Sequence, residues 1–377
     1  MLYVMNHDHP SLDVSLISIG SYCKSICNIV LAPSIKKKDL VDLLPENNLI
    51  FYEMSDSKIV TINNLRVSMN RVLKIYRPDF IVFSSLESLS EAVSLFLSEV
   101  ARSKVKVIAV MHNLNFWDHK GLLCRNALCR YAKYKPRYGL RELYKKVFTR
   151  IDGAILLKHY LARRFYEIFP LPTCVIPFRI STIDITNKLS SKDSSKTRFI
   201  MPGNVEKSRR DYYLIFEAFR SINNDFELVL LGKAVDKEII SEGTKVLGKR
   251  LVYFENRLSE SEFAQYMLKS HFVISNLSYE LPYGVFKASG SEFDGPAFGV
   301  PVLMPVDSPI IQENNVLIRY DRSNLEYTLR ECIKSVINKS YEEKYLKSAL
   351  LSAESLLPAR WSEVFYDFLK RVSGLGS

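Results

Sequence analysis

Residues 198–232 have the sequence RFIMPGNVEKSRRDYYLIFEAFRSINNDFELVLLG, which decides the fold class of the second half of the chain. The stretch begins with a short apolar run at 198–201, passes through a glycine-containing loop and enters a segment of helical periodicity at 210–221. A second apolar run follows at 227–231 and ends at Gly232. Two buried strands joined by a helix predict a parallel βαβ unit.

The same alternation extends in both directions along the chain. Apolar runs typical of strands buried on both faces are found at 48–52, 80–83, 105–110, 154–157, 174–176, 251–254, 272–275 and 301–304. Helical periodicity is found at 65–76, 88–102, 139–150, 158–168, 234–246, 259–269, 288–298, 324–338, 341–356 and 360–373. Strands and helices that alternate at this spacing predict an α/β protein with mostly parallel sheets.

The length and a change in composition predict two domains. At about 150 residues per domain, a chain of 377 residues is too long for one ordinary core. The segment 180–196, ISTIDITNKLSSKDSSK, loses all apolar periodicity and is rich in Ser, Lys and Asp, so we expect the boundary there. We predict a first domain at 1–185, a second at 195–358 and a C-terminal helical segment at 359–377.

The net charge of +11 lies entirely in the first half of the chain. Residues 1–190 contain 27 Lys and Arg against 16 Asp and Glu, whereas residues 191–377 contain 25 of each. Within 120–150, ten basic residues accompany a single acid, Glu142. Two halves with different electrostatics are typical of two domains with different partners.

Basic residues interleaved with Tyr and Leu in segment 121–151 suit an anionic membrane surface or a lipid-pyrophosphate acceptor. The candidate contacts are the basic residues Lys133, Lys135, Arg137, Arg141, Lys145 and Lys146. A solvated, lysine-rich face is the alternative interpretation. Nucleic acid is disfavoured as a partner, because the sequence has no helix-turn-helix, zinc-finger or RNP pattern.

Cysteine usage and hydropathy favour a cytoplasmic protein. The six cysteines are scattered, form no CxxC pair and lack the neighbouring ligands of a zinc site, so we expect reduced thiols. The first residues do not resemble a signal peptide. No stretch reaches the roughly 18–20 uninterrupted apolar residues of a membrane helix, which leaves peripheral association with the cytoplasmic membrane as an option.

The loop PGNVEKSRRDY at 202–212 is the first candidate binding segment. It leaves a strand through Gly203 and enters a helix with Lys207, Arg209 and Arg210 close together. Glycine allows the backbone to approach a ligand closely, and cations beside a helix N-terminus attract anions. The segment therefore predicts a diphosphate site, with a solvated basic turn as the alternative.

The second candidate segment is 283–302, YGVFKASGSEFDGPAFGVPV. Ser289 and Gly290 are expected to open a helix, with Ser289 as a natural N-cap or with a ligand phosphate on the same N–H groups. Glu292 and Asp294 follow at once, where a carboxylate accepts hydrogen bonds from ribose or sugar hydroxyls. A capped surface helix is the alternative. Taken together, the two segments favour a nucleotide diphosphate.

Several motifs in matching order resemble those of GT-B glycosyltransferases, particularly the family 4 (group 1) type. They are IAVMHN at 108–113, DGAILL at 152–157, VIP at 175–177, LLG at 230–232, and the two segments described above. The resemblance covers nearly the whole chain except the first forty residues. It implies two Rossmann-like domains in tandem, the GT-B architecture, with a C-terminal helix that crosses back to the first domain.

The resemblance also implies a function, which is transfer of a sugar from a nucleotide-diphosphate-sugar donor to an acceptor hydroxyl, on a lipid-linked or membrane-surface glycan. The second domain would bind the donor, and the candidate residues are Gly203, Lys207, Arg209, Arg210, Gly232, Tyr283, Ser289, Gly290 and Glu292. His112 would lie near the transferred sugar as a hydrogen-bond partner or base. Cations usually replace a metal in this family, so no metal and no cofactor is expected.

One departure from the family pattern leaves the stereochemistry open. Many retaining members carry two glutamates separated by seven residues, and the corresponding positions here are Phe286 and Asp294. Glu280 lies upstream as a substitute for the first acid, so the catalytic candidates are His112, Glu280 and Asp294. The alternatives to a transferase are a sugar-nucleotide epimerase of the same fold and a non-catalytic protein that binds polyanions or membranes on a degenerate transferase fold.

Overall fold

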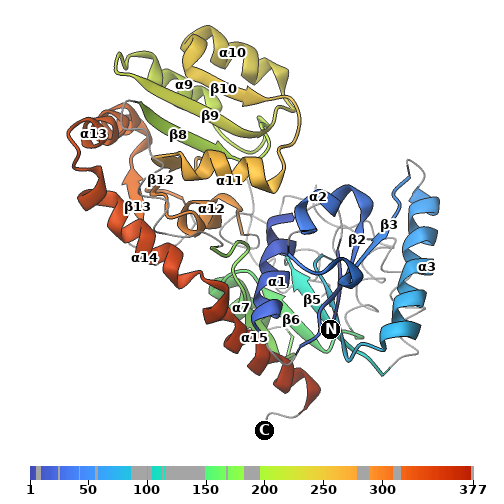
Figure 1. Ribbon diagram of the computed structural model, residues 1–377. Helices are drawn as coiled ribbons and strands as arrows, with labels where there is room; N and C mark the ends of the chain where they lie inside the picture. The colour runs from blue at the N-terminus through green and yellow to red at the C-terminus, as the bar shows by residue number, and fades with distance from the viewer. Residues whose placement is uncertain are drawn as a thin grey trace. The chain divides into compact units, whose positions relative to one another are not determined.

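The computed structural model describes residues 1–5, 10–23, 26–41, 43–55, 58–85, 100, 104–112, 114, 149–166, 169–181, 196–277, 288–308 and 316–374. They form two compact units, shown in Figure 1. Unit 1 extends from Met1 to Phe178 and resumes at Pro358, whereas unit 2 contains most of the residues from Arg179 to Leu357. Most of the predicted linker, 182–195, lies outside the described residues.

Unit 1 contains a parallel sheet with the strand order β3-β2-β1-β4-β5-β6-β7. Its strands are β1 (Leu2–Val4), β2 (Ile29–Pro33), β3 (Leu49–Tyr52), β4 (Phe80–Phe83), β5 (Lys106–Met111), β6 (Gly153–Leu156) and β7 (Thr173–Val175). Its described helices are α1 (Pro10–Tyr22), α2 (Lys37–Leu40), α3 (Lys58–Tyr76), α7 (His159–Tyr166) and α15 (Pro358–Ser373). The order reverses between β1 and β4, as in doubly wound α/β folds.

Unit 2 repeats this design with the strand order β10-β9-β8-β11-β12-β13, again with parallel pairing. Its strands are β8 (Thr197–Pro202), β9 (Phe226–Lys233), β10 (Leu251–Phe254), β11 (Phe272–Ile274), β12 (Val302–Pro305) and β13 (Leu317–Tyr320). Its described helices are α9 (Tyr212–Arg220), α10 (Lys237–Leu247), α11 (Glu260–Leu268), α12 (Ser291–Ala297), α13 (Leu325–Ile337) and α14 (Lys347–Ser355). The order reverses between β8 and β11.

The core of unit 2 shows why its strands form. Alternate residues of β8 and β9 point to the same side of the sheet and share one buried cluster with α9, α10 and α13. Phe199 and Phe219 meet edge to face at 5.1 Å, and Phe219 stacks on Phe226 at 4.6 Å. Helix α9 begins where the Asp211 carboxylate accepts a hydrogen bond from the Leu214 amide at 3.1 Å.

Helix α15 follows unit 2 in sequence but packs in unit 1, against α1 and β7. The packing requires a glycine in β6, because a Cβ at Gly153 would lie 2.7 Å from Val372 and 2.9 Å from Phe368. Arg371 adds a hydrogen bond to the Thr173 carbonyl at 3.1 Å. The predicted fold class, two Rossmann-like units and a C-terminal helix that returns to the first, is confirmed.

The strands predicted from apolar runs are all present, with ends that differ by one or two residues. Helices α1 and α2 and strands β1, β2 and β13 are not among the predicted ranges. Helix α1 is buried on nearly every side, so its sequence lacks a polar face, while β13 is a partly exposed edge strand. The predicted helix 139–150 lies outside the described residues except for its last two, and 88–102 except for Val100.

Candidate functional site

The candidate site lies at the point in unit 2 where the strand order reverses, because the loops after β8 and β11 diverge there. These loops contain residues 203–211 and 275–277. They are joined by a β-bridge between Arg210 and Leu277 and by a hydrogen bond from Asn276 Nδ2 to the Asp211 carbonyl at 2.8 Å. The two loops thus form one connected corner.

Two glycines make this corner possible. Gly203 adopts a φ of 103°, a backbone conformation that other residues rarely adopt. Gly232, at the end of β9, lies so close to Gly203 that an added Cβ would be 2.4 Å from the Gly203 carbonyl carbon. Gly203 and Gly232, two of the three glycines predicted to bind the donor, therefore have a steric reason to be there.

Arg210 is the only one of the three predicted cations in this loop that is buried, with 6% of its surface exposed. Its Nη2 donates to the Pro202 carbonyl, and its Nη1 donates to the Asn204 carbonyl at 3.4 Å. Its Nε is buried without a hydrogen-bond partner. Among the ion pairs of the described residues, none includes Arg210. A buried cation held only by carbonyls strongly favours a nearby anion.

Lys207 and Arg209 lie further out, and both have acidic neighbours. Arg209 Nε lies 3.1 Å from Glu206, and Lys207 Nζ lies 3.8 Å from Glu238. The Lys207 amide also donates to the Asp236 carboxylate at 2.6 Å. These two cations are therefore partly neutralised and screened by solvent, unlike Arg210.

Asn276 and Arg322 belong to this corner but were missed in the sequence. Arg322 donates to Asn276 Oδ1 at 2.8 Å and to the Leu277 carbonyl at 3.3 Å, and its Nε lies 3.4 Å from Asp307. Asn276 is the second residue after β11, and this position in a loop after a strand could have identified it as a candidate from the sequence. Arg322 follows β13, a strand outside the predicted ranges.

Ser289, Gly290 and Glu292 lie at the start of α12, in a compact polar cluster. The Ser289 amide donates to Glu292 Oε1 at 2.6 Å, and the Ser289 and Ser291 hydroxyls are 2.9 Å apart. Ser291 also meets Ser275 at 3.0 Å. The N-cap of α12 is Gly290 rather than Ser289, and the helix begins at Ser291, three residues later than expected. The Glu292 and Phe293 amides at the helix start, where a phosphate was expected to bind, donate to the Ser289 and Gly290 carbonyls at 3.2 and 2.9 Å.

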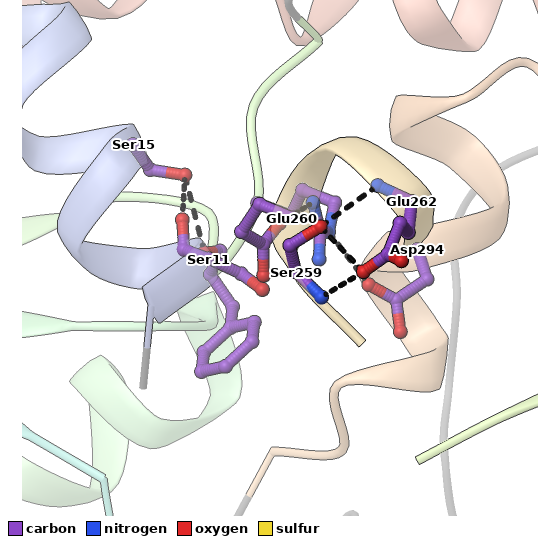
Figure 2. A network of polar contacts seen from close by, with 8 residues as sticks. Ser11, Ser15, Ser259, Glu260, Glu262 and Asp294 are labelled. Atoms are coloured by element: carbon purple, nitrogen blue, oxygen red, sulfur yellow. Dashed lines mark hydrogen bonds and ion pairs between the residues drawn. The ribbon is translucent and has the colours of Figure 1, made fainter. Parts of the chain in front are cut away.

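Asp294 forms a buried ion cluster with a residue far away in sequence. Its Oδ1 accepts from Arg179 Nε at 2.7 Å, and Arg179 Nη1 donates to Glu260 at 2.9 Å. The rings of Phe263 and Phe298 flank the guanidinium at 4.7 and 5.2 Å. Glu260 and Asp294 are seen together in Figure 2. The carboxylate predicted to bind a sugar or ribose hydroxyl is thus engaged by Arg179.

Burial raises the pKa of Asp294 to about 6, although the Arg179 guanidinium opposes this shift by its charge and its hydrogen bond. Glu260 opens α11 directly after Ser259, whose hydroxyl caps the helix by accepting from the Glu262 amide at 3.2 Å. The Glu262 carboxylate in turn accepts a hydrogen bond from the Ser259 amide at 2.8 Å, which completes a capping box (Figure 2). This cap fixes the position of Glu260.

His112 follows β5 in unit 1 and is buried. Its Nε2 lies 2.8 Å from the Ser84 carbonyl, which can only accept, so Nε2 carries the hydrogen. The neutral ring then has its lone pair on Nδ1. Phe178 meets the imidazole edge to face, with centroids 6.3 Å apart. The structure therefore gives His112 a defined tautomer after the strand, at the position predicted.

A buried ion pair in unit 1 was also not predicted from the sequence. Asp13 of α1 and Lys36, just before α2, form a fully buried ion pair. Lys36 stands within a run of three lysines, and Asp13 within an apolar segment. Since their sequence separation carries no periodic signal, only the tertiary structure identifies the pair.

The comparisons with known proteins concern the fold. No protein-family model and no curated protein sequence matches the chain. Solved structures match it over its full length, among them sucrose-phosphate synthase from Thermosynechococcus elongatus. That match has a TM-score of 0.63 and 10% identity, and covers 100% of this chain and 99% of the other.

The Anabaena protein HepE, in complex with UDP and glucose, matches with a TM-score of 0.64, 11% identity and coverage of 98% and 100%. The chain has the GT-B fold. The chain is also similar to a UDP-GlcNAc 2-epimerase from Neisseria meningitidis bound to UDP-GlcNAc. That match has a TM-score of 0.58, 14% identity and coverage of 98% and 99%. The family 4 subtype stays a prediction.

Other predicted residues of the GT-B interpretation lie outside the described part of the chain. These are Glu280, Tyr283, and the basic residues Lys133, Lys135, Arg137, Arg141, Lys145 and Lys146. Within the described ranges, no cluster of three or more His, Cys, Asp or Glu residues is arranged to hold a metal. No described helix is both long and apolar enough to cross a membrane. The four described cysteines, Cys23, Cys27, Cys174 and Cys332, are free thiols.

Proposed function

We propose that the protein is a glycosyltransferase that moves a sugar from a nucleotide-diphosphate-sugar donor to an acceptor hydroxyl. The observation that carries the proposal is Arg210, a buried arginine that forms no direct ion pair among the described residues, at the strand-order reversal of a GT-B unit. The HepE structure with UDP supports a uridine nucleotide as the first donor to test.

Arg210 would stabilise the leaving diphosphate. As the bond from the sugar to the diphosphate breaks, its electron pair stays on the diphosphate, whose negative charge grows. A cation fixed in a low-dielectric corner stabilises that charge more in the transition state than in the ground state. Lys207 and Arg209 add attraction at the solvent-exposed rim. The proposal gives these cations the charge-neutralising role, so no metal is assigned.

The remaining donor contacts stay predictions within this proposal. Gly203 and Gly232 keep the backbone of the corner free of side chains. Ser289, Gly290, Glu292 and Tyr283 are the other candidates for binding the donor, and Glu280 and Asp294 remain the acidic catalytic candidates. Since Asp294 is bound by Arg179, it would act on substrate only if that ion pair rearranged.

Unit 1 would bind the acceptor. His112 would accept the proton of the acceptor hydroxyl or form a hydrogen bond with it. The basic segment that contains Lys133 to Lys146 favours an acceptor on a lipid-linked or membrane-surface glycan at the cytoplasmic side. Retention or inversion of the sugar configuration is left open by this assignment.

Calorimetric titration with UDP, GDP and ADP tests the proposal. We expect one of these nucleotides to bind saturably. Arg210→Ala should weaken that binding by about thirtyfold, because a charged hydrogen-bond donor contributes roughly 2 kcal/mol. Arg209→Ala is the matched control and should change it less than fivefold. Binding should persist in a chelator. If none of the nucleotides binds, the protein is a non-catalytic member of the fold.

An epimerase is the second candidate, favoured by the match to the UDP-GlcNAc 2-epimerase. Incubation with UDP-GlcNAc alone distinguishes the two, because an epimerase needs no acceptor. Appearance of an epimer of the sugar without an added acceptor would replace the transferase assignment. Transfer of the sugar to an acceptor, with release of UDP, would support it.

A further inference from the structure

Helix α3 in unit 1 has an outer face that contains no residue of the proposed donor or acceptor sites. The helix spans Lys58–Tyr76 and packs beside β3, as Figure 1 shows. Its inner face buries Leu65, Met69 and Val72, which are spaced three and four residues apart. The ordinary expectation for the opposite face is a row of polar side chains.

The outer face is instead rich in exposed branched aliphatic residues. Val60, Val67 and Ile75 are 45%, 69% and 60% exposed. Their spacings of seven and eight residues place them along one stripe of the helix. Arg71 and Lys74 lie in the same stripe and are also exposed. Three aliphatic side chains, about two turns apart from one another, thus share one solvent-facing stripe with two cations.

The charge of this helix has one sign. Between Asp56 and Asp79 the sequence contains no acid and five basic residues, which are Lys58, Arg66, Arg71, Lys74 and Arg77. A solvated helix normally mixes both signs to form pairs three or four residues apart. The outer face of α3 therefore contributes positive charge, from Arg71 and Lys74, and no negative charge.

An anionic lipid surface matches both properties of the stripe. Aliphatic side chains enter the boundary between headgroups and acyl chains, while arginine and lysine keep their charged ends at the lipid phosphates. A second copy of the chain is disfavoured, because a two-fold contact would set the cations of one α3 against those of the other. Nucleic acid offers the anions but no apolar environment for Val60, Val67 and Ile75, and the stripe has no aromatic ring for stacking.

We propose that the outer face of α3, defined by Val60, Val67, Arg71, Lys74 and Ile75, binds an anionic lipid surface. None of these residues belongs to the basic segment at 120–150. Lipid binding by α3 does not depend on the proposed transferase activity, so the nucleotide titration and the lipid measurement can fail separately.

Co-sedimentation of the full chain with vesicles tests the proposal. We expect binding to phosphatidylcholine vesicles that contain phosphatidylglycerol, and much weaker binding to phosphatidylcholine alone. Val67→Asp, Ile75→Asp and Arg71→Glu should each lower the partition coefficient roughly tenfold. The matched controls are Leu351→Asp and Lys347→Glu, on exposed positions of α14 in unit 2, and they should leave it unchanged.

Several outcomes would overturn the lipid assignment. One is absence of binding to the anionic vesicles, and another is equal binding by the α3 variants and the wild type. A third is concentration-dependent self-association that Val67→Asp abolishes, which would identify a second copy as the occupant. Binding of RNA that Arg71→Glu abolishes and Val67→Asp leaves intact, without vesicle binding, would identify nucleic acid. Unchanged thermal unfolding of the Asp variants confirms that they are folded.

Discussion

Among the described residues of unit 2, two arginines are buried, and their surroundings differ in charge. Arg179 is 8% exposed and lies between two carboxylates, those of Glu260 and Asp294. Arg210 is 6% exposed but bonds only to main-chain carbonyls, and its Nε has no partner. Equal burial therefore has opposite consequences. Arg179 is neutralised by direct contact with two carboxylates, whereas Arg210 acts on the Asp294 charge without forming an ion pair, so we assign Arg210 to a ligand anion.

The largest expected effect is on the balanced cluster. Arg179→Ala should lower the free energy of unfolding by about 3–5 kcal/mol, because Asp294 and Glu260 would face each other without their cation. Urea denaturation measures the change. Arg220→Ala is the control, since Arg220 forms an exposed pair with Glu217 at 2.8 Å and should matter by less than about 0.5 kcal/mol. A similar small loss for Arg179→Ala would remove the contrast between the two arginines.

The pH dependence of stability tests the Asp294 side of the cluster. With a pKa raised from 3.8 to about 6, native Asp294 binds its proton more tightly than the unfolded chain does. Stability should therefore fall as pH rises from about 4 to 6, by ~1–3 kcal/mol relative to Asp294→Asn, and stay level above that window. The measurement is urea denaturation at a series of pH values for both proteins. A difference that does not vary over this window would show that the carboxylate is already ionised at pH 4.

Arg322 is intermediate between the two cases, because it has one carboxylate, Asp307, and two neutral acceptors. Arg322→Ala should cost about 1–2 kcal/mol of stability and weaken nucleotide binding several-fold, since it holds Asn276 and Leu277 in the corner. Arg322→Lys should recover stability only in part, because one ammonium cannot replace three directed contacts. Calorimetry and urea denaturation of both variants check this. Nucleotide affinity that is unaffected by Arg322→Ala would separate this network from the binding corner.

The smallest effect on the free energy of unfolding is expected when Arg210 is replaced. Arg210→Met should change the free energy of unfolding without ligand by no more than ~1 kcal/mol, because the lost hydrogen bonds are offset by removal of a buried charge that forms no ion pair. Addition of the nucleotide should then raise the melting temperature of the wild type more than that of the variant. A loss near that of Arg179→Ala would mean that Arg210 is mainly structural.

The contrast between the arginines also shows how far the sequence could be interpreted. The glycines of the corner were found because Gly203 and Gly232 directly follow apolar runs. The loop itself has no periodicity, so nothing in the order of Lys207, Arg209 and Arg210 indicated which cation is buried. Asp294 was predicted to bind hydroxyls from its position near a helix start, and its partner Arg179 lies 115 residues away. A pairing at that separation has no local signal.

The sequence by itself determined the two parallel α/β units, because continuous apolar strands alternating with amphipathic helices are stable only when helices cover the sheets. It also determined the one-signed charge of α3, which is a matter of composition. The tertiary structure alone decided which charges are compensated and which are not. Electrostatic energy depends on distance and burial, and both are set by contacts between residues such as Arg179, Glu260 and Asp294 that the chain keeps far apart until it folds.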